Sequence, residues 1–296
     1  MIYTLTLNPS LDYLMDVNGL QLGKTNRSSG TSISFGGKGI NVSYVLEQLG
    51  CKSVCLGICA GFTGEELQRL LKQENLTCDF VKSKTGNTRI NVKLSDTDIT
   101  EINAAGQEIC PEDEEKLLSK LSKASREDTV VVSGSIPTGG EGLYERVLKL
   151  VTEKGALLVV DTSGEMLVKA LNYKPFLIKP NIDELSFFAE KNLENTEDVV
   201  SAAKRLRQTG AVNVLVSMGH KGAVLVDEND KVYYQKAFEI DAVNTVGAGD
   251  SMVAGFLFGL DKGYEYALKM GNACGAASAA SITLAKKDKI NEFLSL

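Results

Sequence analysis

The stretch Asn244-Thr245-Val246-Gly247-Ala248-Gly249-Asp250-Ser251-Met252-Val253-Ala254-Gly255-Phe256 decides how the rest of the chain folds around it. Its glycines permit a tight turn, and the apolar residues that follow have the i, i+3, i+4 spacing of a buried helix face. A helix N-terminus presents unpaired N–H groups and the positive end of the helix dipole, which together attract anions. The stretch therefore predicts an anion site with a carboxylate, Asp250, in its first turn.

Asp250 is open to two interpretations. A carboxylate in the first turn of a helix commonly caps the backbone or complements the helix dipole. The alternative is a general base that takes a proton from a hydroxyl while the N–H groups of Gly247, Ala248 and Gly249 hold the phosphate that this hydroxyl attacks. The glycine spacing fits neither a dinucleotide fingerprint nor a Walker A loop. The more specific hypothesis is therefore phosphoryl transfer at a site that is neither a dinucleotide-binding motif nor a Walker A loop.

Length and composition narrow the class of protein. The 296 residues suffice for one large α/β domain or for a core with a smaller accessory domain. A net charge of −6 with scattered Lys and Arg argues against nucleic acid as a partner. No apolar run approaches the ~18 residues of a membrane span, and the first residues lack the pattern of a signal peptide. We therefore expect a cytoplasmic protein that does not engage a membrane.

From residue 53 onward, predicted strands and helices alternate along the chain. The strands are continuous apolar runs, as is typical of strands buried on both faces, and the alternation predicts a mostly parallel sheet covered by helices. The predicted strands are 1–8, 53–59, 129–133, 156–161, 176–179, 213–217 and 223–226, and the predicted helices begin near 42, 64, 112, 142, 165, 183 and 198.

Two Ser/Thr-rich segments, about 13–35 and 86–104, interrupt this pattern with short stretches of alternating polarity. Such segments are typical of exposed strands, and together they predict a small separate sheet. A small sheet with one apolar face must be covered by the core, a ligand or a partner chain. We therefore expect a lid that also forms a homodimer contact.

A second glycine-rich helix start, Gly36-Gly37-Lys38-Gly39-Ile40-Asn41-Val42, carries a lysine. A single lysine is usually a solvated surface residue. Here, however, the flanking glycines let a substrate approach the backbone, and an ammonium beside helix N–H groups suits a phosphate. Asp12, after the first strand, is equally a solvated turn residue or an acceptor for a sugar hydroxyl.

Polar loops follow four of the predicted strands. In open α/β sheets ligands bind beyond the carboxyl ends of the strands, so these loops are candidates for one shared site. Each loop alone is unremarkable, but four of them beside two glycine-rich helix starts favour a binding site. The loops are 133–137, 161–164, 179–185 and 217–222.

Four of these motifs, in order along the chain, resemble motifs of the PfkB or ribokinase-like sugar kinases. Gly36 to Val42 is similar to the N-terminal signature of that family, and Gly247 to Asp250 to its C-terminal signature. Lys179-Pro180-Asn181 with Glu184 resembles an Asn-x-x-Glu magnesium motif, and Ser217 to Gly222 a nucleotide loop. The resemblance implies that residues 1–296 form a single ribokinase-like kinase domain, a doubly wound α/β core with a small β lid.

Within the family, the chain resembles the branch that acts on ketohexose monophosphates. Lys38, Arg27 and Arg89 match positions that hold the phosphate already on the sugar, and Ser135 matches a polar partner. The resemblance implies ATP-dependent phosphorylation of fructose 1-phosphate at O6, giving fructose 1,6-bisphosphate and ADP. Phosphorylation of tagatose 6-phosphate at O1 is the alternative, and a catalytically silent sugar-phosphate sensor is a remote one.

The resemblance also implies roles for individual residues. Asp250 is the expected base, with Gly247, Ala248 and Gly249 supplying N–H groups, and Mg²⁺ accompanies ATP. Many relatives have Asp where this chain has Asn244, so a monovalent-cation site stays open. The implied sugar-phosphate contacts are Asp12, Arg27, Gly37, Lys38, Asn41, Arg89 and Ser135; the implied ATP contacts are Lys179, Ser217, Gly219, Lys221, Gly222, Gly249 and Asn272; and the implied metal residues are Glu184 and Asn181.

Overall fold

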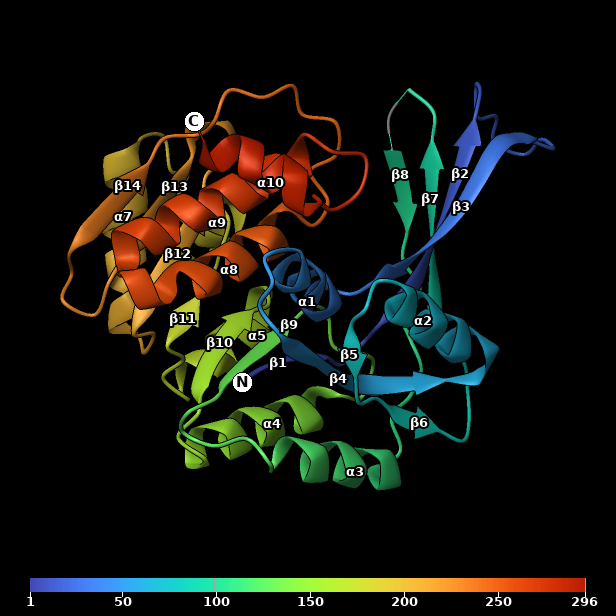
Figure 1. Ribbon diagram of the computed structural model, residues 1–296, viewed down its shortest axis with the longest axis horizontal. Coiled ribbons are helices and arrows are strands. Elements are labelled where there is room, and N and C mark those ends of the chain that lie inside the picture. The colour runs from blue at the N-terminus through green and yellow to red at the C-terminus, as the bar shows by residue number, and fades with distance from the viewer. Residues whose placement is uncertain (98, 296) are drawn as a thin grey trace.

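A computed structural model describes residues 1–97 and 99–295; position 98, inside the second predicted lid segment, lies outside the described residues. Figure 1 shows a large sheet surrounded by helices, with a smaller sheet projecting from one side. The strands of the large sheet are β1 (Ile2–Thr6), β4 (Ser53–Ala60), β5 (Thr77–Cys78), β6 (Val81–Ser83), β9 (Thr129–Ser133), β10 (Leu157–Asp161), β11 (Leu177–Ile178), β12 (Asn213–Ser217), β13 (Ala223–Val226) and β14 (Val232–Gln235).

The strand order of the large sheet is β14-β13-β12-β11-β10-β9-β1-β4-β5, and β6 also pairs with β4. Pairing is parallel from β5 to β12, and only the β12–β13 and β13–β14 pairs of this order are antiparallel in the part of the chain that is described. The predicted mostly parallel, helix-covered sheet is confirmed. Because all the parallel strands end at one edge, the polar loops that follow them collect there.

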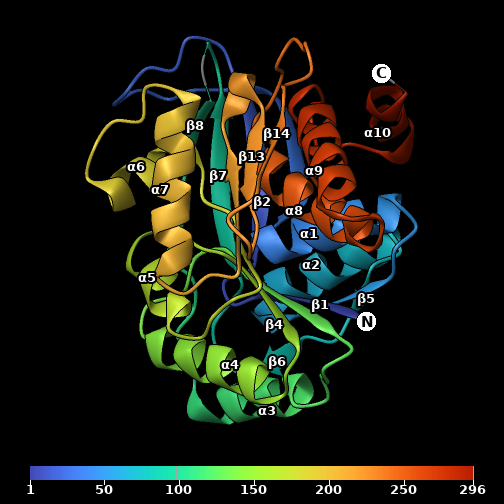
Figure 2. The ribbon, with the colours of Figure 1, turned by 90° about the vertical axis from the view of Figure 1, so that its left-hand side faces the viewer.

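Helices cover both faces of the large sheet (Figure 2). Alternate strand residues point to opposite faces, so in β9 Val130 and Val132 pack into one apolar cluster and Val131 into the other. This double burial explains the continuous apolar strands. One cluster contains residues of α3 (Pro111–Leu121), α4 (Glu141–Glu153), α5 (Gly164–Leu171), α6 (Ile182–Ala189) and α7 (Thr196–Gln208), and the other contains residues of α1 (Lys38–Gln48), α2 (Gly61–Gln73), α8 (Ala248–Gly259), α9 (Tyr264–Ala279) and α10 (Lys287–Leu294).

Helix α8, which carries Asp250, is almost completely buried. It packs closely on α9 because glycines face the contact: a Cβ at Gly255 would lie 2.5 Å from the carbonyl oxygen of Met270, and one at Gly271 would lie 2.8 Å from that of Met252. Side chains longer than hydrogen do not fit at these points. This packing fixes the position of the glycine-rich turn that begins α8.

The smaller sheet, hereafter the lid, is formed by β2 (Ser10–Val17), β3 (Ser28–Gly36), β7 (Arg89–Ser95) and β8 (Ile99–Ile102) in the order β3-β2-β7-β8. Its strands come from both predicted lid segments. One face is polar and carries Asp12 and Asn91, which are register partners. On the opposite face, Ile33 and Ile102 are 47% and 58% exposed. The lid therefore presents one polar face and one partly uncovered apolar face.

Among the described residues, no helix is both long enough and apolar enough to cross a lipid bilayer.

The predicted elements lie within a few residues of the observed ones, but β5, β6, β14, α9 and α10 were not individually expected. The first strand ends at Thr6 rather than at residue 8, because Asn8 turns away from the sheet and hydrogen-bonds the carbonyl of Ala105 at 2.9 Å.

Candidate active site

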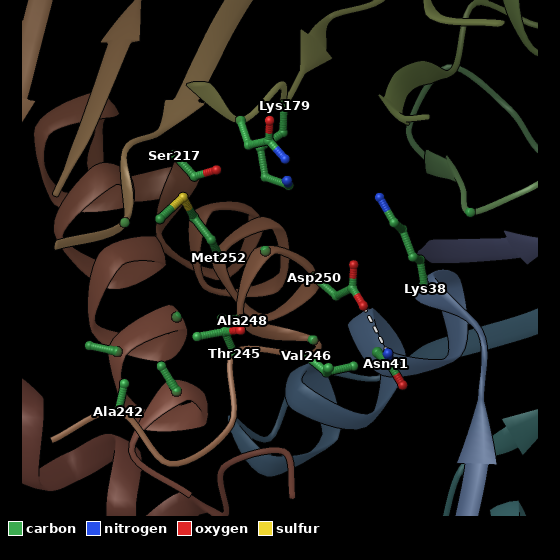
Figure 3. A pocket seen from close by; sticks show the side chains of 18 of the residues that line it. Lys38, Asn41, Lys179, Ser217, Ala242, Thr245, Val246, Ala248, Asp250 and Met252 are labelled. Atoms are coloured by element: carbon green, nitrogen blue, oxygen red, sulfur yellow. Dashed lines mark hydrogen bonds between the residues drawn. The ribbon is translucent and has the colours of Figure 1, made fainter. Parts of the chain in front are cut away.

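A cavity of about 1400 Å³ lies where the lid, the carboxyl edge of the large sheet and the first turns of α1 and α8 meet. Figure 3 shows its centre, with Lys38, Lys179 and Asp250 directed into the same space. Most of the residues predicted from the sequence line it, namely Asp12, Gly37, Lys38, Asn41, Arg89, Ser135, Lys179, Asn181, Ser217, Gly219, Gly222, Gly247, Ala248, Gly249, Asp250 and Asn272. Arg27, Lys221 and Glu184 are not among its lining residues.

The first turn of α8 places Asp250 at the centre of the cavity. Gly247 precedes the helix with φ +80°, and a Cβ there would lie 2.4 Å from the side chain of Leu284. The buried carboxylate of Asp250 accepts a hydrogen bond from the amide of Asn41 at 2.8 Å (Figure 3). Burial, followed by the nearby charge of Asp161, raises the pKa of Asp250 to about 6. A carboxylate with this pKa is ionised at neutral pH yet accepts a proton readily.

Asp161, at the end of β10, joins the two lysines of the site. Its side chain is 1% exposed, and Oδ1 lies 3.3 Å from Nζ of Lys38 and 3.4 Å from Nζ of Lys179. Burial alone would raise the pKa of Asp161, but Lys179 and Lys38 outweigh burial and lower it. In return, Asp161 raises the pKa of Lys38. Two neighbouring carboxylates thus have pKa values displaced in opposite directions, which is typical of acid–base sites.

No role for Asp161 is predicted from the sequence. The available signal was its position, because a carboxylate that directly follows a continuous apolar strand lies at the ligand-binding edge of a parallel sheet. The loop 161–164 was recognised as polar, but nothing in the sequence indicated that it would meet Lys38, which is distant along the chain.

Arg89 is held rigidly at the junction of lid and core. Its Nε and Nη2 donate to the carbonyl of Asn8 at 3.2 and 2.9 Å, and Nη1 donates to the carbonyl of Ala104 at 3.0 Å. The hydroxyl of Ser135 lies 3.4 Å from Nη2. Burial lowers the pKa of Arg89, although a guanidinium stays charged at neutral pH. Arg89 and Ser135 thus lie together in the cavity wall, and their contact with a substrate phosphate stays a prediction.

Asp12 lies on the polar face of the lid among groups that orient it. Its Oδ1 accepts from the Ser10 hydroxyl at 2.9 Å and from the Asn91 amide at 3.0 Å. Its Oδ2 lies 2.9 Å from Nζ of Lys93. Asn91 and Lys93 were missed by sequence reasoning, although the alternation that begins at Arg89 places all three on one face of a strand.

The predicted nucleotide loop lines the same cavity as residues of α8 and α9. Ser217, Gly219 and Gly222 contribute to the lining, and so do the small residues Gly275, Ala276 and Ala279 of α9. A lining of glycines and small apolar side chains suits a flat aromatic base.

Two predicted nucleotide contacts point elsewhere or are already engaged. The ammonium of Lys221 donates to the carbonyl of Glu194 at 3.3 Å and does not face the cavity. Asn272 lines the cavity, but its amide donates to the carbonyl of Lys236 at 2.9 Å. The side chains of Lys221 and Asn272 therefore hydrogen-bond the protein backbone, where a contact with the nucleotide was expected.

Asn181 and Glu184 form a reciprocal capping box at the start of α6. Oδ1 of Asn181 accepts from the backbone N–H of Glu184 at 2.8 Å, and Oε2 of Glu184 accepts from the N–H of Asn181 at 2.9 Å. This arrangement satisfies two otherwise unpaired helix N–H groups. Within residues 1–97 and 99–295, no cluster of three His, Cys, Asp or Glu side chains could hold a metal ion.

Arg27 lies far from the cavity within its own chain. Arg27 is exposed and directly precedes β3. It lies at the outer end of the β2–β3 hairpin, where Val17 pairs with Ser28, whereas Ser10 pairs with Gly36 at the end next to the core. A strand rises roughly 3.3 Å per residue, so the length of the hairpin separates Arg27 from Asp12. The predicted contact of Arg27 with the site of the same chain is not formed.

Comparison with known proteins gives a consistent result. Residues 5–287 match the model of the pfkB family carbohydrate kinase. The chain is 42% identical to a 1-phosphofructokinase of Bacillus subtilis over 99% of this chain and 97% of the relative. It is 32% identical to a D-tagatose-1-phosphate kinase of Bacillus licheniformis over 99% of this chain and 97% of the relative.

A solved structure has the same fold. The crystal structure of phosphofructokinase-2 from Escherichia coli in complex with substrates and products is 30% identical, with a TM-score of 0.93 over 99% of this chain and 98% of that one. The ribokinase-like architecture expected from the sequence is thereby confirmed. From the family match and the near full-length relatives, this chain belongs to the pfkB family of carbohydrate kinases.

Proposed function

We propose that the protein transfers the γ-phosphoryl group of ATP to O6 of fructose 1-phosphate, giving fructose 1,6-bisphosphate and ADP. The observation that carries this proposal is the pair of cations, Lys38 and Arg89, in the same cavity as Asp250. A neutral sugar needs no such pair, whereas a phosphate already on the substrate binds well to an ammonium and a guanidinium. The similarity to a 1-phosphofructokinase along nearly the whole chain supports the same substrate.

The roles of the residues follow from their chemistry. The pKa of about 6 suits Asp250 to accept the proton of the O6 hydroxyl as that oxygen attacks. The N–H groups at the start of α8 stabilise the charge of the phosphoryl group in transfer, and this electrostatic contribution is commonly the larger one. Asn41 acts chiefly by orienting Asp250, because its amide donates to that carboxylate.

The residues near the phosphates fit Mg²⁺ that accompanies ATP. Oδ2 of the buried Asp161 has no hydrogen-bond partner among the described residues, and Asn181 and Glu184 are engaged in their capping box. Since Mg²⁺ keeps several waters, the metal residues expected from the sequence would hold it through that shell: Asn181 lines the cavity, and Glu184 adjoins it in the capping box. When bound, the ion neutralises negative charge on the phosphates.

A monovalent cation in the loop before α8 is a weaker proposal. Asn244, which occupies the position where many relatives have Asp, joins two loops by its own hydrogen bonds. Its Nδ2 donates to the carbonyl of Ile282 at 2.9 Å, and its Oδ1 accepts from the N–H of Val246 at 3.0 Å. A direct amide link between the loops reduces the need for a bridging ion. Activity that is independent of added K⁺ would agree with this arrangement.

We also propose a homodimer formed through the lid. The partly exposed Ile33 and Ile102 lie on the apolar face of the lid, and a small sheet with such a face is stabilised by covering it. We further propose that, in this dimer, the exposed hairpin end with Arg27 contacts the cavity of the partner copy. The role predicted for Arg27 would then be fulfilled across the dimer.

D-Tagatose 1-phosphate is the second candidate substrate, because a relative at 32% identity is named for it. It differs from fructose 1-phosphate only in configuration at C4, so the same phosphate contacts and the same O6 attack would serve both. Tagatose 6-phosphate, the alternative expected from sequence, would have to bind in the reverse orientation and present O1 to Asp250.

A coupled assay of ADP release with Mg-ATP tests the proposal. We expect the highest kcat/KM for fructose 1-phosphate, a lower value for tagatose 1-phosphate, and much lower values for fructose 6-phosphate, tagatose 6-phosphate and free fructose. A preference for either 6-phosphate would reverse the proposed orientation of the sugar. Activity confined to unphosphorylated sugars would contradict the role of Lys38 and Arg89.

A further inference from the structure

The carboxylate of Asp12 has little remaining capacity to accept hydrogen bonds. An ionised carboxylate offers about four acceptor sites, two on each oxygen. On Asp12, the Ser10 hydroxyl and the Asn91 amide occupy Oδ1, and Lys93 occupies one site on Oδ2 at 2.9 Å. A sugar hydroxyl that donates to Asp12 must therefore use Oδ2, directly beside the ammonium of Lys93.

Lys93 itself keeps donor capacity for a ligand. Its ammonium has three N–H donors; one faces Oδ2 of Asp12, and Oε1 of Glu101 lies farther away, at 3.7 Å. The side chain is only 16% exposed, yet Lys93 lines the cavity. At least one N–H is thus free to donate to an oxygen that enters the cavity next to Asp12.

We propose that Lys93 is a specificity-determining residue that reads one secondary ring hydroxyl of the substrate together with Asp12. The hydroxyl donates a hydrogen bond to Oδ2 of Asp12 and accepts one from the ammonium of Lys93. A hydroxyl with the opposite configuration, or one that is missing, forfeits both bonds and leaves the two partly buried charges paired with each other. The inference rests on the proposed function, since it concerns the sugar site of the same kinase.

This paired contact would distinguish fructose 1-phosphate from its epimers. The phosphate contacts of Lys38 and Arg89 are the same for every ketohexose 1-phosphate, so they cannot discriminate at C3 or C4. A donor and an acceptor fixed side by side on the lid can, because both geometries must be met by one oxygen. A purely structural role, in which Lys93 only joins β7 to β8 through Glu101, predicts no dependence on the sugar.

The first test compares Lys93→Met with the wild type for both substrates. Loss of a hydrogen bond to a charged group commonly weakens binding by about tenfold to a hundredfold, so we expect KM for fructose 1-phosphate to rise by that factor. KM for ATP should stay within about twofold. Lys93→Arg, which keeps the charge, should recover part of the loss. Lys84→Met is the matched control, because Lys84 is 79% exposed and its ion pair among the described residues is with Glu112 at the surface.

The second test combines Lys93→Met with 3-deoxy and 4-deoxy fructose 1-phosphate. In the wild type, removing the hydroxyl that Lys93 reads should lower kcat/KM strongly; in Lys93→Met the same removal should cost several-fold less. Equal losses in both proteins for both analogues would overturn the proposal, as would an equal rise of KM for sugar and ATP. If the wild type prefers another sugar phosphate, the proposed function fails, and the same variants are compared on that sugar and its deoxy forms.

Discussion

At the scale of single residues, Asp250 carries the clearest expectation. Its pKa of about 6, raised by burial and by Asp161, predicts that kcat/KM falls as the pH drops below 6, because a protonated carboxyl cannot accept the hydroxyl proton. A pH–rate profile between pH 5 and 9 checks this.

Asp250→Asn should keep ATP binding and lose about 10²- to 10⁴-fold in kcat. A variant with more than a tenth of normal turnover would contradict the assignment.

The same carboxylate should reduce the stability of the unliganded protein. A raised carboxyl pKa means that the folded state binds protons more tightly than the unfolded state. The stabilisation by protonated Asp250 is complete below the ordinary pKa of 3.8 and is lost as the pH rises through about 6. Asp250→Asn should therefore raise Tm at pH 8 and change it little at pH 4. Asp161→Asn should lower Tm at pH 8, since the pKa of Asp161 is lowered by two lysines.

Functional residues were predictable from the sequence where their neighbours along the chain form a recognisable pattern. Asp250 and Lys38 stand in glycine-rich helix starts, so a local pattern exposed both. Asp161 and Lys93 escaped because their partners are distant in sequence, Lys38 for the first and Asp12 for the second. Arg27 was expected in the cavity from the resemblance to the family. The sequence does not give the length and direction of the β2–β3 hairpin, which place Arg27 away from the cavity of its own chain.

At the scale of elements, the start of α8 depends on the absence of a side chain at Gly249. A Cβ there would lie 2.9 Å from Nζ of Lys179. Because this is the end of a flexible side chain, Gly249→Ala should fold normally but displace the lysine, lowering kcat/KM for ATP by about tenfold to a hundredfold. Gly142→Ala in α4 is the control, since its methyl would meet nothing within 4 Å. A loss of Tm without a change in ATP kinetics would contradict this expectation.

Elements were predictable where burial imposes a pattern. Strands such as β9 and β10 have continuous apolar runs, 130–132 and 157–160, because both faces of the sheet are covered. In contrast, β5 and β6 have only two and three residues and carry no periodicity. The Asn181–Glu184 spacing shows a further limit. An Asn followed by Glu three residues later is the signature of a capping box as well as of a metal motif, and the side chains form the box.

At the scale of the whole molecule, the lid should set the oligomeric state. Ile33, Tyr13, Val92 and Ile102 form one row across the sheet by strand register. A double variant that carries Ile33→Asp and Ile102→Asp should be monomeric by sedimentation and should have a raised KM for the sugar phosphate. Phe187→Asp, on α6 and 76% exposed, is the control. A double variant that remains dimeric, or a monomeric wild type, would contradict a lid-mediated dimer.

The overall assembly was predictable in outline. The alternation of strands and helices indicated the core, and the two Ser/Thr-rich segments indicated a second sheet. Their order in space was not predictable, because β2 and β7 pair although they are far apart in the chain. No local pattern specifies which strands from separate segments become neighbours.

The lid enters the chain as two insertions, one between β1 and α1 and the other between β6 and α3. Asp12, Asn91 and Lys93 belong to these insertions, whereas Asp250, Asp161 and Lys179 belong to the core. Under the proposed roles of these residues, substitutions in the insertions alter which sugar is accepted, whereas substitutions in the core alter phosphoryl transfer. Remodelling of the lid alone would then suffice to change the acceptor.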